Sequence, residues 1–126
     1  MKKAIQTEQA PAAIGPYSQA ITSENLLFIS GQLPVNPSSG NIEVTDADQQ
    51  AEQILLNLKS VLSAAGLTFD HVVKTTIFLT DLTDFQAVNE VYKQHASTPF
   101  PARSTIQVAA LPMGAKVEIE AIAQLA

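Results

Sequence analysis

Arg103 is the residue whose type most clearly suggests chemistry, because six of the seven cationic residues in this 126-residue chain are lysines and Arg103 is the only arginine. A guanidinium offers a planar fork of donors that matches a carboxylate, which an ammonium cannot reproduce. Pro99 and Pro101 shortly before it restrict its backbone. Two roles are open for Arg103: a clamp for a small organic anion, or an ion pair with one of the twelve acidic residues.

Glu118 and Glu120 form a second candidate group near the C-terminus. They alternate with Val117, Ile119 and Ala121, so in a strand both acids lie on the face opposite the apolar set. On a solvent-facing side they are ordinary surface acids. If that face is partly covered, burial raises the pKa of a carboxyl group toward the range of a general acid or base.

Two short motifs could bring backbone and hydroxyl groups to a ligand. In Gly15-Pro16-Tyr17-Ser18 the phenol of Tyr17 has a defined direction, and it could either bind a substrate or simply pack. In Ser30-Gly31-Gln32 a glycine at the exit of a strand allows a ligand to approach the backbone.

Composition excludes several classes of chemistry. The chain has no cysteine, which removes disulfides, thiolate metal ligands and a cysteine nucleophile. His71 and His95 lack metal-ligand spacing, and no glycine-rich phosphate loop or serine elbow occurs. The net charge of −5 argues against nucleic acid and anionic membranes as partners. We therefore expect chemistry without a cofactor or metal, in a cytoplasmic protein with neither a signal peptide nor a membrane span.

The elements that must position these residues follow from the spacing of apolar residues, and they describe one domain over residues 1–126. Strands are predicted at 17–22, 26–30, 71–80, 103–110 and 116–125, with a loop at 31–44. One helix is expected to start at the N-cap Thr45 and to stop at Gly66. A second begins with a capping box formed by Thr83 and Gln86 and ends before Pro99.

The resulting order, β-β-α-β-α-β-β, predicts a mixed sheet with both helices on one face. The strand runs LLFIS and TIFL are apolar at consecutive positions, which suits burial on both sides, and no third helix is available for the second face. We therefore expect a homo-oligomer whose sheets pack together.

Five motifs, which occur in order along nearly the whole chain, resemble the RidA/YjgF (reactive intermediate deaminase) family. They are GPYSQA at 15–20, FISGQLP at 28–34, DF-x-x-VN-x-VY at 84–92, P-x-P-ARST at 99–105 and LP-x-GA-x-VEIEAIA at 111–123. The resemblance implies an α+β fold of the chorismate-mutase type, related to ferredoxin-like folds, assembled as a homotrimer with a site in each cleft between subunits. It also implies that another strand separates the last two strands.

The activity implied by the resemblance is hydrolysis of 2-imino acids, chiefly 2-iminopropanoate and its enamine tautomer 2-aminoacrylate and also 2-iminobutanoate, to 2-keto acids and ammonia. Arg103 takes the place of the family's carboxylate clamp and Glu120 that of its acid/base glutamate. The residues implied to bind substrate are Tyr17, Ser30, Gly31, Asn89 from the neighbouring chain, Thr105 and Pro112. Many relatives carry cysteine where this chain has Thr105, which weakens any role for a thiol.

Three other functions remain open at this point. A ribonuclease or translation inhibitor would need paired histidines or metal-binding carboxylates, together with a basic surface. The acidic composition of the chain argues against this function. A chorismate-mutase-like pericyclic enzyme would need more than one arginine per chain to hold a dicarboxylate. A holdase or small-ligand-binding module without catalysis fits if Arg103 is engaged in an ion pair.

Overall fold

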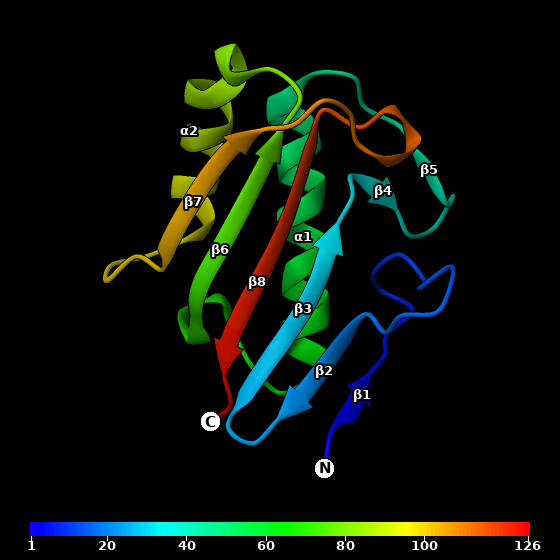
Figure 1. Ribbon diagram of the computed structural model, residues 1–126, viewed down its shortest axis with the longest axis vertical. Coiled ribbons are helices and arrows are strands. Elements are labelled where there is room, and N and C mark those ends of the chain that lie inside the picture. Colours follow the sequence, from blue (N-terminus) through cyan, green and yellow to red (C-terminus); the bar gives the residue numbers. More distant parts are fainter.

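The computed structural model describes residues 1–126 as a six-stranded sheet with two helices packed against one of its faces (Figure 1). The sheet strands are β1 (Lys3–Ile5), β2 (Ala20–Ser23), β3 (Leu26–Gln32), β6 (Val72–Leu79), β7 (Ala102–Gln107) and β8 (Val117–Gln124). The helices are α1 (Ala47–Ala64) and α2 (Phe85–His95), accompanied by three short 3₁₀ turns, η1 (Phe69–His71), η2 (Leu82–Asp84) and η3 (Pro112–Gly114).

The strand order is β1-β2-β3-β8-β6-β7, with β6 and β7 parallel and every other pair antiparallel. The prediction of a mixed sheet with both helices on one face is confirmed, and β6 separates the last two strands as the resemblance implied. Sequence patterns missed β1 and the hairpin of β4 (Val35–Asn36) with β5 (Asn41–Ile42) inside the expected loop. The strand predicted from residue 17 starts only at Ala20, so Tyr17 lies in a loop.

Helix α1 forms the centre of the core because its apolar residues recur every three or four positions. Ile54, Leu55, Leu58, Val61 and Leu62 are all fully buried against the sheet. The predicted N-cap was wrong by one residue: Asp46 occupies that position and its side chain makes no capping hydrogen bond. The C-terminal stop is as expected, since Gly66 has a φ of 76°.

Helix α2 begins differently from the prediction. The expected capping box of Thr83 and Gln86 is absent, because Asp81 accepts hydrogen bonds from both the backbone amide and the hydroxyl of Thr83 and so caps η2. Helix α2 then starts at Phe85. Its Val88 and Tyr92 are buried in the core. These contacts hold α2 in place beside β7.

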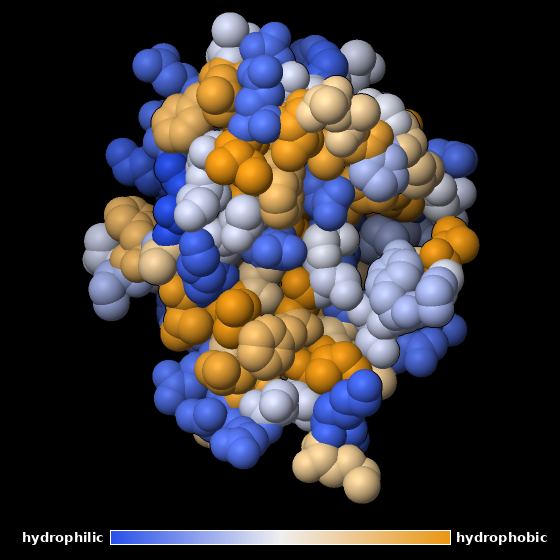
Figure 2. Space-filling model, in the orientation of Figure 1, coloured by the Kyte–Doolittle hydropathy of each residue, from blue (hydrophilic) through white to orange (hydrophobic).

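The face of the sheet away from the helices carries two groups of apolar side chains, with Glu120 and Thr76 between them. The register pairs Ile21 with Phe28 and Phe28 with Ile122, while Phe78 pairs with Ile106 farther along the sheet. Phe28 and Ile106 remain 41% and 45% exposed. Figure 2 shows the apolar side chains gathered over the lower half of this face. We call the whole face of the sheet away from the helices the open face.

Neither helix has the length and hydropathy needed to cross a bilayer.

Candidate active site

The guanidinium of Arg103 is held by three side chains of α2. Its Nη1 donates to Oδ1 of Asn89 at 2.7 Å. Its central carbon lies 5.0 Å from the ring centroid of Tyr92 and 5.6 Å from that of Phe85, both within the range of cation–π attraction. Tyr92 is itself fixed, because its hydroxyl lies 2.8 Å from that of the fully buried Thr75. Arg103 therefore has a defined orientation without any acidic partner.

The ion-pair alternative for Arg103 does not hold. The one salt bridge in the structure joins His95 to Glu52, and no carboxylate oxygen lies within 4.0 Å of the guanidinium. Arg103 instead borders a hollow of about 390 Å³ together with Asn89, Tyr92, Lys93, Phe100 and Pro101. An unneutralised guanidinium beside an open hollow can receive an anion.

Glu120 lies in a different hollow, on the open face. This hollow measures about 450 Å³ and brings together residues of the loop before β2 and of β2, β3, β6 and β8. Its polar members include Tyr17, Ser30, Lys74 and Glu120, and apolar side chains such as Phe28 and Ile122 form its floor. A carboxylate beside hydroxyl groups in a partly apolar hollow has the composition of an acid/base site.

A β-bulge in β3 faces Glu120. Ile29 pairs with Ala121 and Gln32 with Ile119, so two residues of β3, Ser30 and Gly31, lie opposite the single residue Glu120. Glu118 reaches across to the same bulge, and a Cβ atom on Gly31 would overlap its carboxylate. Burial, and secondarily the charge of Glu120, raises the pKa of Glu118 above its ordinary value. The glycine thus admits a carboxylate of its own chain.

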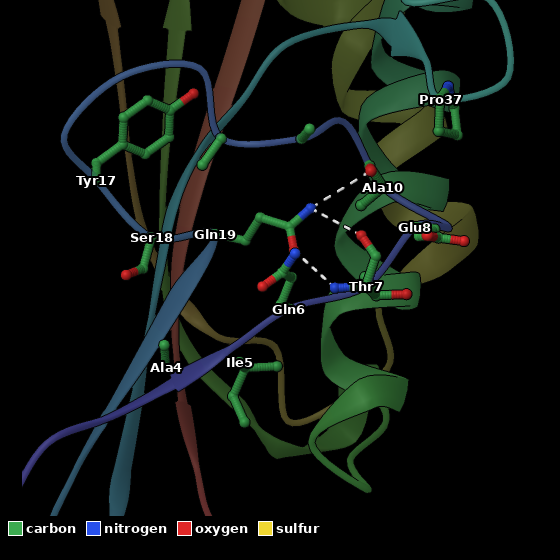
Figure 3. Close-up of a pocket in the computed structure, with 12 residues that line it drawn as sticks. Ala4, Ile5, Gln6, Thr7, Glu8, Ala10, Tyr17, Ser18, Gln19 and Pro37 are labelled. Atoms are coloured by element: carbon green, nitrogen blue, oxygen red, sulfur yellow. Dashed lines mark hydrogen bonds between the residues drawn. The ribbon is translucent and has the colours of Figure 1, made fainter.

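Tyr17 is presented by a loop that the buried Gln19 holds in place. The Gln19 amide accepts from the backbone of Thr7 and donates to the carbonyl groups of Thr7, Ala10 and Pro11, as Figure 3 shows for Thr7 and Ala10. Tyr17 is 53% exposed, and its hydroxyl accepts from the amide of Ile14 at 3.3 Å. The phenol is therefore positioned near the open-face hollow but remains accessible.

Residues 7–125 match the family described as Endoribonuclease L-PSP. The goat (Capra hircus) 2-iminobutanoate/2-iminopropanoate deaminase is 51% identical over 98% of this chain and 90% of its own length. The Arabidopsis thaliana chloroplastic Reactive Intermediate Deaminase A is 52% identical over 98% of this chain and 66% of its own length. The chain belongs to the RidA/YjgF family.

Solved structures of the RidA/YjgF family share this fold closely. The Rid-family protein YyfA of Yersinia pestis superposes with a TM-score of 0.96 at 49% identity, over 98% of this chain and 99% of that one. TdcF of E. coli, solved with bound serine, gives a TM-score of 0.92 at 48% identity over 98% and 99% of the two chains. The α+β architecture predicted from the sequence is thus that of the family.

Arg103 and Glu120 lie on opposite faces of the sheet in this RidA/YjgF protein. Arg103 pairs in register with Thr75, which is buried under the helices, and Glu120 pairs with the next residue, Thr76, whose side chain lines the open-face hollow. Strand β6 also separates their strands. One copy of the chain therefore does not bring the proposed clamp and the proposed acid/base group together.

The remaining predicted site residues divide between these places. Asn89 accepts a hydrogen bond from Arg103 of its own chain, and its contribution to a cleft between neighbouring chains stays a prediction. Thr105 lies two residues beyond Arg103 on the same strand, and its hydroxyl is buried without a hydrogen-bond partner. Pro112, in η3, is exposed and borders neither hollow.

Sequence reasoning missed two features of this RidA/YjgF site. The rings of Phe85 and Tyr92 support Arg103, and neither residue was singled out from the sequence. Lys74 was not singled out, yet it lines the hollow of Glu120 and donates to the hydroxyl of Ser104 at 3.2 Å. No signal in the sequence marks either role, because the first depends on how α2 packs beside β7 and the second on the register of β6 in the sheet.

Proposed function

We propose that this chain hydrolyses 2-imino acids, with 2-iminopropanoate and 2-iminobutanoate as the central substrates, to 2-keto acids and ammonia. The observation that carries the proposal is the state of Arg103: a guanidinium oriented by Asn89, Tyr92 and Phe85, bordering a hollow, with no acid in contact. Such a group is prepared to bind the carboxylate common to all 2-imino acids. The names of the goat and Arabidopsis relatives support the same reaction, and the serine held by TdcF is a carboxylate of similar size.

We propose further that each site forms between two copies of the chain in a homotrimer. Arg103 and Glu120 lie on opposite faces of one sheet, so a substrate small enough for one carboxylate and one imine cannot contact both groups of a single copy. The open face supports the assembly, because its apolar side chains Phe28 and Ile106 are exposed. Strand β7, which carries Arg103, is an edge strand of the sheet, so packing of this edge of one copy against the open face of another would bring Arg103 to the Glu120 hollow.

The reaction needs little beyond positioning and one proton carrier. Arg103 holds the carboxylate, and Glu120, as a carboxylate, accepts a proton from the water that adds to the imine carbon. The C–O bond forms at the carbon of the protonated imine as the C=N bond becomes single, giving a neutral carbinolamine. Glu120 then returns the proton to nitrogen, the C–N bond breaks to release ammonia, and the carbinol hydroxyl proton passes to the Glu120 carboxylate as the C=O bond forms. The products are a 2-keto acid and ammonia.

Mixing two inactive variants tests both the reaction and the shared site. Arg103→Ala and Glu120→Gln should each lose nearly all acceleration of imine hydrolysis. If they are unfolded together, refolded and assayed, about one quarter of the sites should combine an intact Arg103 with an intact Glu120 from another copy. Recovery of about a quarter of wild-type activity is therefore expected. No recovery in mixed oligomers, shown to be mixed by mass spectrometry, would contradict the shared site.

The rate of imine hydrolysis with wild-type protein tests whether the chain catalyses the proposed reaction. The rate of disappearance of 2-iminopropanoate, generated in place by an L-amino acid oxidase, should rise in proportion to added protein. A holdase or a module that only binds ligand would leave the rate at that of the uncatalysed hydrolysis, and this result would overturn the proposed function.

A further inference from the structure

The hollow beside Arg103 contains a second cation that the proposed reaction does not use. Lys93 borders the same space of about 390 Å³, and none of the 6 residues that line it is acidic. The chain as a whole has twelve acidic residues and only seven cationic ones. Two cations around one hollow without an acid are therefore a local exception to the charge of the molecule, and they favour an anionic ligand.

Lys93 lies on the side of α2 that binds Arg103. It follows Asn89 by four residues, so the two side chains are neighbours on one face of the helix. Asn89 accepts the hydrogen bond from Nη1 of Arg103, and Figure 1 shows α2 beside β7, the strand of Arg103. The guanidinium is thus fixed at the hollow, and Lys93 projects toward the same space from about 5 Å farther along the helix.

The Lys93 ammonium has no acidic partner. Glu90 precedes it by three residues on α2, a spacing at which helical ion pairs form. The only salt bridge of the structure nevertheless joins His95 to Glu52. The side chain of Lys93 is exposed, so its charge is available to a ligand in the hollow, as is that of Arg103.

The remaining walls of the hollow suit a short apolar chain between two charges. Phe100 and Pro101 contribute apolar surface, and Phe100 is 51% exposed. Methylene groups of a ligand can pack against this surface and remove it from water while the charged ends bind the two cations. A molecule of this shape has a carboxylate at each end and methylene groups between them.

We propose that the hollow of Arg103 accepts 2-imino dicarboxylic acids, with Arg103 on the carboxylate next to the imine and Lys93 on the carboxylate that ends the side chain. This inference rests on the proposed function and extends its substrate class beyond 2-iminopropanoate and 2-iminobutanoate. In a five-carbon chain the two carboxylate carbons lie about 5 Å apart when extended, similar to one helical turn. The imine derived from glutamate is therefore the type example, and its hydrolysis gives 2-oxoglutarate and ammonia.

This arrangement keeps the second carboxylate away from Glu120. In the proposed assembly Glu120 comes from another copy and acts at the imine carbon, so a side-chain carboxylate directed toward it would be repelled. A side chain that runs along α2 toward Lys93 instead brings opposite charges together. The same carboxyl-ended chain is therefore attracted in one direction and repelled in the other.

Binding of two 2-keto acids of equal length tests the inference without turnover. 2-Oxoglutarate and 2-oxopentanoate both have five carbons, and only the first has a terminal carboxylate. Calorimetry on the wild-type protein at low salt should give a dissociation constant about fivefold lower for 2-oxoglutarate, the gain from one exposed ion pair. The net charge of −5 acts against a dianion, so the overall field cannot produce this preference. Equal affinities, or tighter binding of 2-oxopentanoate, would overturn the inference.

Lys93→Met assigns the preference to the residue. It removes the charge but keeps an unbranched side chain, so the ratio of the two dissociation constants should fall to about one. Lys93→Arg keeps the charge and should retain the preference. Lys59→Met, at an exposed position of α1, is the matched control and should keep the wild-type ratio. A folded Lys93→Met protein with the full wild-type preference would show that Lys93 does not bind the terminal carboxylate.

Salt provides a measurement that needs no variant. An ion pair at an exposed lysine is screened, so the preference of wild-type protein for 2-oxoglutarate should largely disappear at about 0.5 M salt. If Lys93→Met does not fold, this loss together with the ratio at low salt decides the inference. A preference that does not change with salt would contradict it.

Kinetics separate this inference from the proposed function. Imines derived from glutamate and norvaline are generated in place by amino acid oxidases, and kcat/KM should be higher for the glutamate-derived imine. If neither of these nor 2-iminopropanoate is hydrolysed faster than in buffer, the proposed function fails. If 2-iminopropanoate is hydrolysed but wild-type protein shows no preference for the dicarboxylate, only this inference is wrong.

Discussion

Nη1 of Arg103 donates to Oδ1 of Asn89 at 2.7 Å, which places the chain's only arginine under the control of α2 rather than of an acid. The carbonyl oxygen of an asparagine orients a guanidinium without neutralising it. The positive charge therefore stays available, while the side chain loses rotational freedom before any ligand arrives. Preorganisation of this kind reduces the entropy lost on binding.

Substitution of Arg103 by lysine tests whether the fork or only the charge matters. Lysine keeps the charge but loses the bidentate geometry, so kcat/KM for 2-iminopropanoate should fall by about ten- to a hundredfold. Steady-state kinetics with matched measurements of thermal unfolding provide the check. Lys59→Ala, on the exposed side of α1, should behave as wild type. An Arg103→Lys variant with unchanged kcat/KM would mean that the fork does not bind substrate.

Tyr92 has two roles that two substitutions can separate. Tyr92→Phe keeps the ring under Arg103 but leaves the buried Thr75 hydroxyl without its partner, so the free energy of unfolding should fall by about 1–3 kcal/mol with KM unchanged. Tyr92→Leu removes the ring, and KM should also rise because the guanidinium loses its support. Denaturant unfolding and kinetics on both variants give the comparison. Equal KM values in the two variants would show that the ring does not position Arg103.

The raised pKa of Glu118 implies that the stability of the fold depends on pH. Burial and the charge of Glu120 raise its pKa in the folded chain above the ordinary value of 4.5. The folded state then favours the protonated carboxyl, so stability is fully present below pH 4.5 and declines as pH rises through the higher folded pKa. Glu118→Gln removes this penalty and should unfold at a higher temperature than wild type at pH 7.

The advantage of Glu118→Gln should shrink as the pH falls toward 4.5, because wild-type Glu118 then becomes neutral as well. Thermal unfolding across this range measures the difference. Glu90→Gln, at an exposed position of α2, is the control and should follow wild type at every pH. A stabilisation by Glu118→Gln that does not change with pH would point to packing rather than ionisation.

Most of the fold could be predicted because its main elements carry strong periodic patterns. The buried face of α1 recurs at helical spacing, and β8 alternates strictly between buried and more exposed residues. The missed elements are short: β1 has three residues and β4 and β5 have two each, too few to establish a period. Such strands are defined by the neighbours that they pair with and not by their own sequence.

The candidate site was predictable by residue type but not by place. The rarity of arginine and the alternation around Glu120 marked both residues. Their placement on opposite faces depends on the register of β6 between β7 and β8, which brings Thr75 beside Arg103 and Thr76 beside Glu120. A shift of one residue exchanges the faces, and no local pattern in the chain specifies this register. Thr83 shows the same limit. The sequence pattern pairs Thr83 with Gln86, whereas in the structure its amide donates to Asp81, which caps η2.

The additional residue in the β3 bulge makes it possible to change the site without changing the hydrophobic core. Ile29 and Gln32 both point inward although three positions separate them, whereas a regular strand would need an even spacing. Deleting Gly31 would restore strict alternation with the same interior residues, so a shortened protein can keep its hydrophobic interior intact. Any activity that it lost would then measure what the irregular strand contributes to chemistry alone.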